Sequence, residues 1–205
     1  MDLSGLLPFI LASLLMELTP GPNMAYLAIV ALGEGRAKGY AAVAGVALGL
    51  AIVGLAAALG IAAVVQASPL LYQALRWGGV AYLLWLAWIG WRGADDPPEH
   101  AARGSSRWAF FRRGLVTNLL NPKAFAFYIA VLPGFLRAGS DPARQAVMLS
   151  LVYVAIATVV HLAIVTAAAA SHRLLDDPAR ARTIRRALSV MLAGVAVWLL
   201  IKTGR

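Results

Sequence analysis

The chain has 205 residues, of which 61% are hydrophobic and 13% are charged, and it carries a net charge of +9 and no cysteine. Soluble domains contain roughly 45–50% apolar residues, so this composition excludes a soluble globular protein and indicates a membrane protein. The absence of cysteine excludes thiol redox chemistry and thiolate metal sites. Most basic residues lie in short loops between apolar stretches, which indicates membrane topology and argues against a nucleic-acid partner.

Six apolar stretches each approach the roughly 20 residues that a helix needs to cross a bilayer. We therefore predict an all-α membrane protein with six transmembrane helices in a single domain over residues 1–205. The first stretch is preceded by Asp2 and not by basic residues, and it is too long for the apolar region of a signal sequence, so we expect it to be retained. The predicted spans are 3–31, 40–66, 69–91, 114–136, 145–170 and 186–201.

A long polar interruption at about 92–113 divides three spans from three. We interpret it as a cytoplasmic linker between half one, about 1–91, and half two, about 114–205. An odd number of crossings in each half inverts the second half relative to the first, which predicts two inverted three-helix repeats, as in many secondary transporters. The loops after spans one, three and five carry most of the Lys and Arg, so we place them in the cytoplasm and both termini outside. A re-entrant span one or four would change this orientation.

The motif "ELTPGPN" interrupts the first span. Pro20 and Pro22 have no backbone N–H, and each proline moves the residue before it away from helical geometry. We predict two half-helices, with Thr19 as the N-cap and Pro20 as the first residue of the second. Free N–H groups around Gly21 and Asn23 then form a positive helix end that suits a carboxylate.

The motif "TNLLNPKA" interrupts the fourth span in a corresponding position. By the same reasoning, Asn121 is predicted to be an N-cap and Pro122 the first helical residue. Lys123 then lies in the first turn, where a cation inside the hydrocarbon costs a few kcal/mol and needs a partner. That partner is Glu17 or the carboxylate of a bound substrate; the alternative is that Lys123 reaches the cytoplasmic face.

Each break by itself is explained by a helix kink, but two breaks in corresponding spans favour a transport site. Glu17 is an acidic residue within a span, so we consider it as a proton carrier, with a capping anion beside the restarted helix as the alternative. His161 in the fifth span either relays protons or packs as a hydrogen-bonded residue.

Other functions remain as alternatives. The spans offer few carboxylates or soft ligands, which argues against a carrier of metal cations, and we predict neither a metal site nor a cofactor. Ser150 and His161 lie roughly 16 Å apart along one helix at 1.5 Å per residue, too far apart for the nucleophile and base of an intramembrane hydrolase, so we predict no enzyme. A transporter of another cation or anion, and an accessory membrane subunit without transport, stay open.

With "TPGPN" in span one, "GGVAYLLWLA" in span three and "FRRGLVTNLLNPKA" leading into span four, the chain resembles the LysE/RhtB family of amino-acid exporters. The resemblance implies a multi-pass exporter of amino acids or their derivatives in the bacterial inner membrane, driven by proton exchange. The partners implied are an amino acid, the proton and the lipid bilayer. GxxxG spacing at Gly45 and Gly49 serves packing within a chain or between chains, so a homo-oligomer stays open. The substrate-binding positions implied are Thr19, Pro20, Gly21, Pro22, Asn23, Asn118, Asn121, Pro122 and Lys123.

The proton-coupling roles of Glu17 and His161 come from the residues themselves and not from the resemblance. In the resulting picture, the two half-helix ends present backbone donors, Asn121 and Lys123 to a substrate carboxylate. Carbonyl oxygens freed by the breaks accept the hydrogens of the substrate ammonium, and one half rocks against the other around this site. Asn121→Ala or Pro20→Ala is expected to abolish export and to leave the protein in the membrane.

Overall fold

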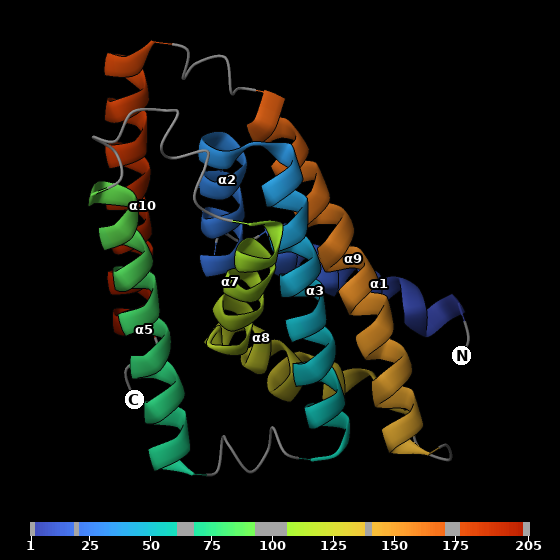
Figure 1. Ribbon diagram of the computed structural model, residues 1–205. Helices are drawn as coiled ribbons and strands as arrows, with labels where there is room; N and C mark the ends of the chain where they lie inside the picture. The colour runs from blue at the N-terminus through green and yellow to red at the C-terminus, as the bar shows by residue number, and fades with distance from the viewer. Residues whose placement is uncertain are drawn as a thin grey trace.

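The computed structural model describes residues 3–18, 21–60, 68–92, 106–137, 141–170 and 177–202. Within these ranges every regular element is helical (Figure 1). A π-helix, η1, and a 3₁₀ helix, η2, follow the short helix α8. The elements are α1 Leu3–Leu18, α2 Pro22–Glu34, α3 Arg36–Ala58, α5 Pro69–Arg92, α7 Arg107–Leu119, α8 Pro122–Ala126, η1 Phe127–Val131, η2 Leu132–Phe135, α9 Pro142–Ala170 and α10 Pro178–Lys202.

The third and fifth predicted spans agree with α5 and α9 to within a few residues. Three other helices begin earlier than predicted, α3 by four residues, α7 by seven and α10 by eight. The two larger differences arise because caps allow a helix to start in a charged segment that hydropathy alone assigns to a loop. At the start of α7, the Ser106 side chain accepts a hydrogen bond from the Ala109 N–H. At the start of α10, the Asp177 side chain does the same for the Ala179 N–H. The end of the second predicted span, beyond residue 60, lies outside the described residues.

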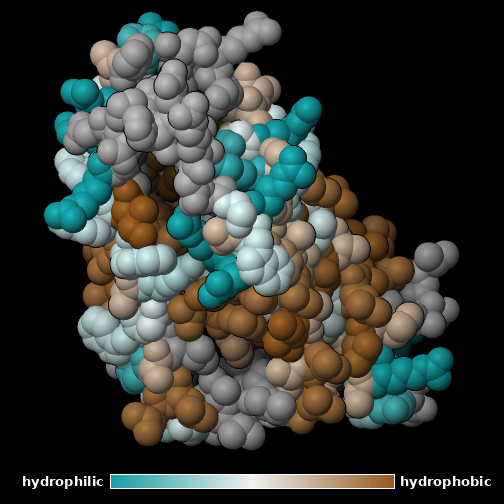
Figure 2. Space-filling model, in the orientation of Figure 1, coloured by the Kyte–Doolittle hydropathy of each residue, from teal (hydrophilic) through white to brown (hydrophobic). Residues whose placement is uncertain are grey.

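The apolar surface of the protein is extensive. Figure 2 shows a broad hydrophobic face, with polar residues gathered mainly near the upper end of the molecule. Among the described helices, α3 and α9 are long and apolar enough to cross a membrane by themselves. Shorter apolar stretches lie in α1 and α5, at Leu6–Leu18 and Trp77–Ile89.

Both predicted chain breaks are present. The first span divides between α1 and α2, and the fourth divides between α7 and α8. In Figure 1, α2 and α7 run along the bundle, whereas α1 and the chain that follows α7 run across it. Segments one and four are therefore bent at their breaks and do not form straight spans.

The first break restarts two residues later than predicted. Gly21, not Thr19, is the N-cap of α2, and Pro22, not Pro20, is its first residue. The reason is that Pro22 excludes helical geometry at Gly21, which is extended with φ −160° and ψ 177°, so the helix cannot begin before this position. Thr19 and Pro20 themselves lie outside the described residues.

The helices α3 and α7 cross in direct backbone contact. A Cβ on Gly45 would lie 2.0 Å from the carbonyl oxygen of Phe111, and one on Gly114 would lie 2.2 Å from that of Ala42. Small residues at a crossing allow this close approach between membrane helices. The helix α3 also packs on α9, α2 packs on α9, and α5 packs on α10. Each bent segment thus packs against the long middle helix of the other predicted half.

Candidate functional site

The two chain breaks meet at one small polar cavity. Its volume is about 10 Å³, roughly the room that one water molecule needs. A larger solute can enter only if the walls move apart. The lining residues come from α1, from α2 and its cap, and from α3, α8 with its cap, and α9: Glu17, Gly21, Asn23, Met24, Leu50, Asn121, Lys123, Ala124, Tyr153 and His161.

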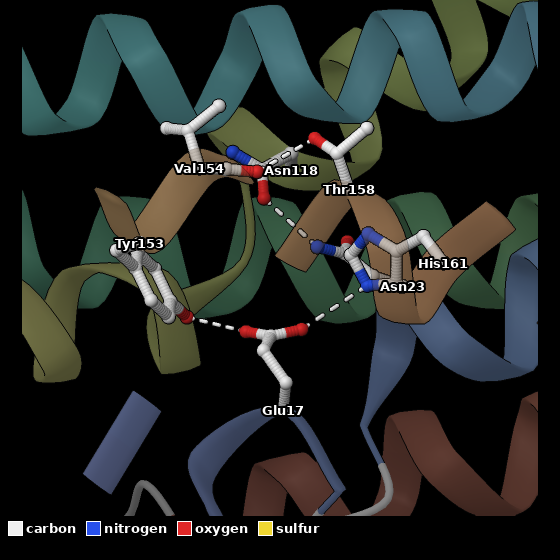
Figure 3. Close-up of polar contacts among 7 residues, drawn as sticks. All are labelled: Glu17, Asn23, Asn118, Tyr153, Val154, Thr158 and His161. Atoms are coloured by element: carbon white, nitrogen blue, oxygen red, sulfur yellow. Dashed lines mark hydrogen bonds and ion pairs between the residues drawn. The ribbon is translucent and has the colours of Figure 1, made fainter. Parts of the chain in front are cut away.

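Glu17, in the last turn of α1, lies against two polar side chains of α9 (Figure 3). Its Oε1 accepts a hydrogen bond of 2.5 Å from the Tyr153 hydroxyl, and its Oε2 lies 3.2 Å from His161 Nε2. All three side chains are buried, and His161 is only 1% exposed. The carboxylate is therefore held by α9 and not by the first turn of α2, which disfavours the capping interpretation of Glu17.

Aromatic packing fixes the position of the Tyr153 ring. Phe127 stacks on it with a centroid distance of 3.7 Å, and Tyr128 meets it edge-on at 5.5 Å. The Tyr128 hydroxyl donates a 3.0 Å hydrogen bond to the Leu50 carbonyl of α3. Phe127 and Tyr128 are the first two residues of the π-helix η1. The π-helix is a rare conformation that is often found at functional sites. The π turn thus places two rings around the tyrosine that contacts Glu17.

Lys123 extends over the break in the first segment. A Cβ on Gly21 would lie 3.2 Å from Lys123 Cδ and 3.5 Å from its Nζ, so any larger residue at position 21 would press on this side chain. The Lys123 cation and the Glu17 carboxylate line the same cavity and attract one another. Of the partners predicted for Lys123, the structure thus places Glu17 near it.

A hydrogen bond joins the two motifs across the halves. Asn23 Nδ2 in α2 donates to Asn118 Oδ1 in α7 at 2.8 Å, and both side chains are buried. Gly49 of α3 makes room for this pair, because a Cβ there would lie 2.8 Å from Asn118 Nδ2. Within the described part of the chain, Asn23 Oδ1 and Asn118 Nδ2 are buried without a hydrogen-bond partner. Such atoms are costly to leave unpaired, and they are available to a bound molecule.

Asn121 caps α8 as predicted. Its Oδ1 accepts a 3.0 Å hydrogen bond from the Lys123 N–H, and Pro122 is the first helical residue. The Ala124 N–H donates to the Asn121 carbonyl at 3.1 Å. These backbone donors are therefore used within the chain, and the prediction that the start of α8 offers free donors to a ligand is wrong. At the start of α2, Gly21 has no side chain that could cap the helix.

Most of the predicted site residues are thus brought together. The cavity contains Gly21, Asn23, Asn121 and Lys123, together with Glu17 and His161. Two other predicted residues lie beside it: Asn118 is hydrogen bonded to Asn23, and Pro22 is buried at the start of α2.

Sequence reasoning missed Tyr153 as a site residue. The available signal was its spacing from Ala157 and His161, because residues four and eight positions apart share one face of a helix. All three are buried on α9. A tyrosine in an apolar span has no distinctive motif around it. Its contact with Glu17 is therefore known only from the tertiary structure.

Comparison with known proteins decides the class of the molecule. The family model described as LysE type translocator matches residues 14–203, which include both chain breaks and the whole cavity. The chain belongs to the LysE type translocator family. This LysE-type translocator is a membrane transport protein and not an enzyme, so the resemblance noted in the sequence is confirmed and the hydrolase alternative is excluded.

Several relatives cover much of the LysE-type translocator. It is 28% identical over 189 residues to a homoserine/homoserine lactone efflux protein of Salmonella typhimurium, covering 91% of this chain and 92% of that protein. It is 35% identical to an uncharacterised membrane protein of Pseudomonas aeruginosa, with 70% and 72% covered. It is 33% identical to a leucine efflux protein of an Enterobacter species, with 62% of each covered. No solved structure matches the chain.

Proposed function

We propose that this translocator is a secondary active exporter of amino acids or amino-acid derivatives, driven by proton antiport across the bacterial inner membrane. One observation carries the proposal: the breaks of both halves meet at a buried cavity that contains a carboxylate, Glu17, and an amine, Lys123. An amino acid has the same two charged groups and needs partners for both. The efflux proteins among the relatives, named for homoserine and for leucine, support an amino-acid substrate.

The proposal includes six membrane crossings in two inverted halves of one domain, about 1–91 and about 114–205, joined by a cytoplasmic linker. The packing supports it, because α7 lies on α3 and α2 lies on α9, so the bent segment of each half contacts the middle helix of the other. A two-fold axis in the membrane plane would relate these two contacts. Rocking of one half against the other would open the cavity to each side in turn.

A carboxylate would bind where donors converge. The first turn of α2 has the positive end of a helix dipole, and Lys123 lies over its cap at Gly21. Asn118 Nδ2 is buried nearby without a partner among the described residues, and it can donate when the walls move. The start of α8 contributes through Asn121, which fixes the backbone of Lys123. These donors come from both halves, so substrate binding would couple their movement.

The test is efflux from proteoliposomes loaded with a mixed amino-acid pool under an inward proton gradient. The released amino acids are identified by mass spectrometry and compared with those from empty vesicles. Gradient-dependent release of a subset supports the proposal, provided that the Asn121→Ala variant loses it and the cap-preserving Asn121→Ser variant retains most of it. If folded and inserted protein releases no amino acid, the proposal fails, and another solute or an accessory role becomes the better explanation.

A further inference from the structure

Glu17 is a buried carboxylate beside two side chains that are able to carry a positive charge. His161 Nε2 lies 3.2 Å from Glu17 Oε2, and Lys123 lines the same cavity as the carboxylate. His161 Nε2 makes no well-aligned hydrogen bond to any described residue, and its contact with Glu17 becomes an ion pair only when the imidazole is protonated. A carboxylate buried in a membrane needs such a cation, because leaving it unpaired is strongly unfavourable.

The cavity also has a second acceptor beside this carboxylate. Asn23 lines it, and its Oδ1 is buried without a hydrogen-bond partner among the described residues. A primary ammonium has three hydrogens to donate. Glu17 and Asn23 together therefore suit an ammonium, while Lys123 and the first turn of α2 suit a carboxylate.

Resting on the function proposed above, we infer that Glu17 is the shared anion of the exchange, which means that its carboxylate binds either the substrate ammonium or the exchanged proton. The substrate is a zwitterionic amino acid with an uncharged side chain. When substrate is bound, its ammonium pairs with Glu17 and its carboxylate pairs with Lys123. When substrate leaves, a proton enters the Glu17–His161 pair and supplies the positive charge instead. Proton and substrate exclude one another because each satisfies the same carboxylate.

The charge balance of the cavity sets the class of substrate. With His161 neutral, Glu17 and Lys123 cancel, and a zwitterion leaves the balance unchanged. The side chain of lysine or glutamate would add a buried charge, and the lining residues include no second carboxylate or amine to neutralise it. We expect export of such amino acids to be at least roughly 100-fold weaker, because a buried charge without a partner is strongly unfavourable.

Among the described residues, few titratable or charged groups face Glu17 from the neighbouring elements. They are Lys123 from α8, Tyr153 and His161 from α9, and Tyr128 from η1. Two of these are phenols, so Lys123 and His161 are the cations available to the carboxylate. Because Lys123 also serves the substrate carboxylate, His161 is the group that shares the exchanged proton. The proton-loaded cavity carries one more positive charge than the substrate-loaded cavity, so export should be electrogenic.

The experiment uses proteoliposomes that contain a pH-sensitive dye and equal concentrations of leucine, threonine, lysine and glutamate. The pH is equal on both sides, and K⁺ with valinomycin clamps the membrane potential. Release is measured by mass spectrometry, and proton entry is measured as acidification of the lumen. Wild-type protein is expected to release leucine and threonine with acidification, and to release lysine and glutamate at least roughly 100-fold more slowly.

Variants of Glu17 and His161 separate substrate binding from proton transfer. Glu17→Gln should lose both release and acidification, whereas His161→Gln should release leucine and threonine without acidification. Two controls should behave as wild type: Thr158→Val, which alters α9 outside the cavity lining, and Glu34→Gln, which removes a carboxylate that pairs with Lys38. Acidification at the wild-type rate in either Glu17→Gln or His161→Gln overturns the shared-anion inference.

The wild-type protein gives a test that does not depend on any variant folding. A membrane potential that is negative inside should accelerate the release of leucine and threonine, because each cycle carries positive charge inward. If the release rate does not depend on the membrane potential, or if lysine or glutamate is released equally fast, this inference is overturned. Amino-acid export itself would still be supported. If no amino acid is released, the proposed function fails and this inference fails with it.

Discussion

Replacing Gly114 by alanine should force α3 and α7 apart. The new Cβ would lie 2.2 Å from the Ala42 carbonyl oxygen, whereas ordinary contact begins near 3.4 Å, so the helices must separate by about 1.2 Å. The atoms that collide belong to the backbone, so a change of side-chain rotamer cannot relieve the clash. Asn118 lies one turn further along α7, so the same movement disturbs its hydrogen bond with Asn23.

Gly114→Ala should lower the free energy of unfolding. Overpacking a tight contact costs about 1–3 kcal/mol, and a clash with backbone belongs at the upper end of that range. Alanine regains about 0.5–1 kcal/mol relative to glycine within a helix. The net destabilisation is therefore about 2 kcal/mol. For a chain of this length, that corresponds to a decrease of about 4–8 °C in melting temperature.

Thermal unfolding in detergent, followed by the fluorescence of the six tryptophans, measures this change. Thiol-reactive dyes are unsuitable because the chain has no cysteine. The matched control is Gly194→Ala in α10, where a Cβ meets nothing within 4 Å, so its stability should stay equal or rise slightly. If Gly114→Ala unfolds at the same temperature as Gly194→Ala, the reasoning about the α3–α7 contact is refuted.

Three further predictions concern the site and its surroundings. Asn121→Ala should lower the free energy of unfolding by about 1 kcal/mol and abolish amino-acid export. Asn121→Ser keeps a capping oxygen and should keep most of the export activity. Equal export by the two variants would contradict the capping role. Asn23→Ala and Asn118→Ala should show a coupling energy of about 0.6 kcal/mol in a double-mutant cycle of thermal unfolding. If the two losses of stability simply add, the hydrogen bond between these side chains contributes nothing. Tyr128→Phe should cost about 1 kcal/mol by removing the bond to the Leu50 carbonyl, and unchanged unfolding would show that this bond contributes nothing.

Several features of the site were predictable because they depend on local chemistry. Proline has no N–H and restricts the residue before it, so breaks at "TPGPN" and "LNPKA" follow from a few neighbouring residues. The cap at Asn121 was predictable for the same reason. Where two prolines compete, as at the first break, the same rules permit more than one restart, and the structure selects Gly21 over Thr19.

Other features depended on surroundings that no local motif describes. Hydropathy alone predicts loops at the charged segments where α7 and α10 begin, but in the structure these segments are the capped first turns of the two helices. The donors predicted to be free at the start of α8 are used by its own cap and first turn. Tyr153 carries no motif, and its role depends on the ring of Phe127 that positions it.

The sequence by itself determined the membrane class, the family, both breaks and most of the residues at the site. The membrane class follows from composition, and the breaks follow from the conformational limits of adjacent residues. The family and some of the site residues, such as Asn118, follow from the resemblance of the two motifs. Only the tertiary structure decided which residues meet: Asn23 with Asn118 across 95 positions, and Glu17 with Tyr153 across 136. Such contacts depend on how closely whole helices approach. In this protein, Gly45, Gly49 and Gly114 permit that approach by leaving room for backbone and amide groups that a larger side chain would exclude.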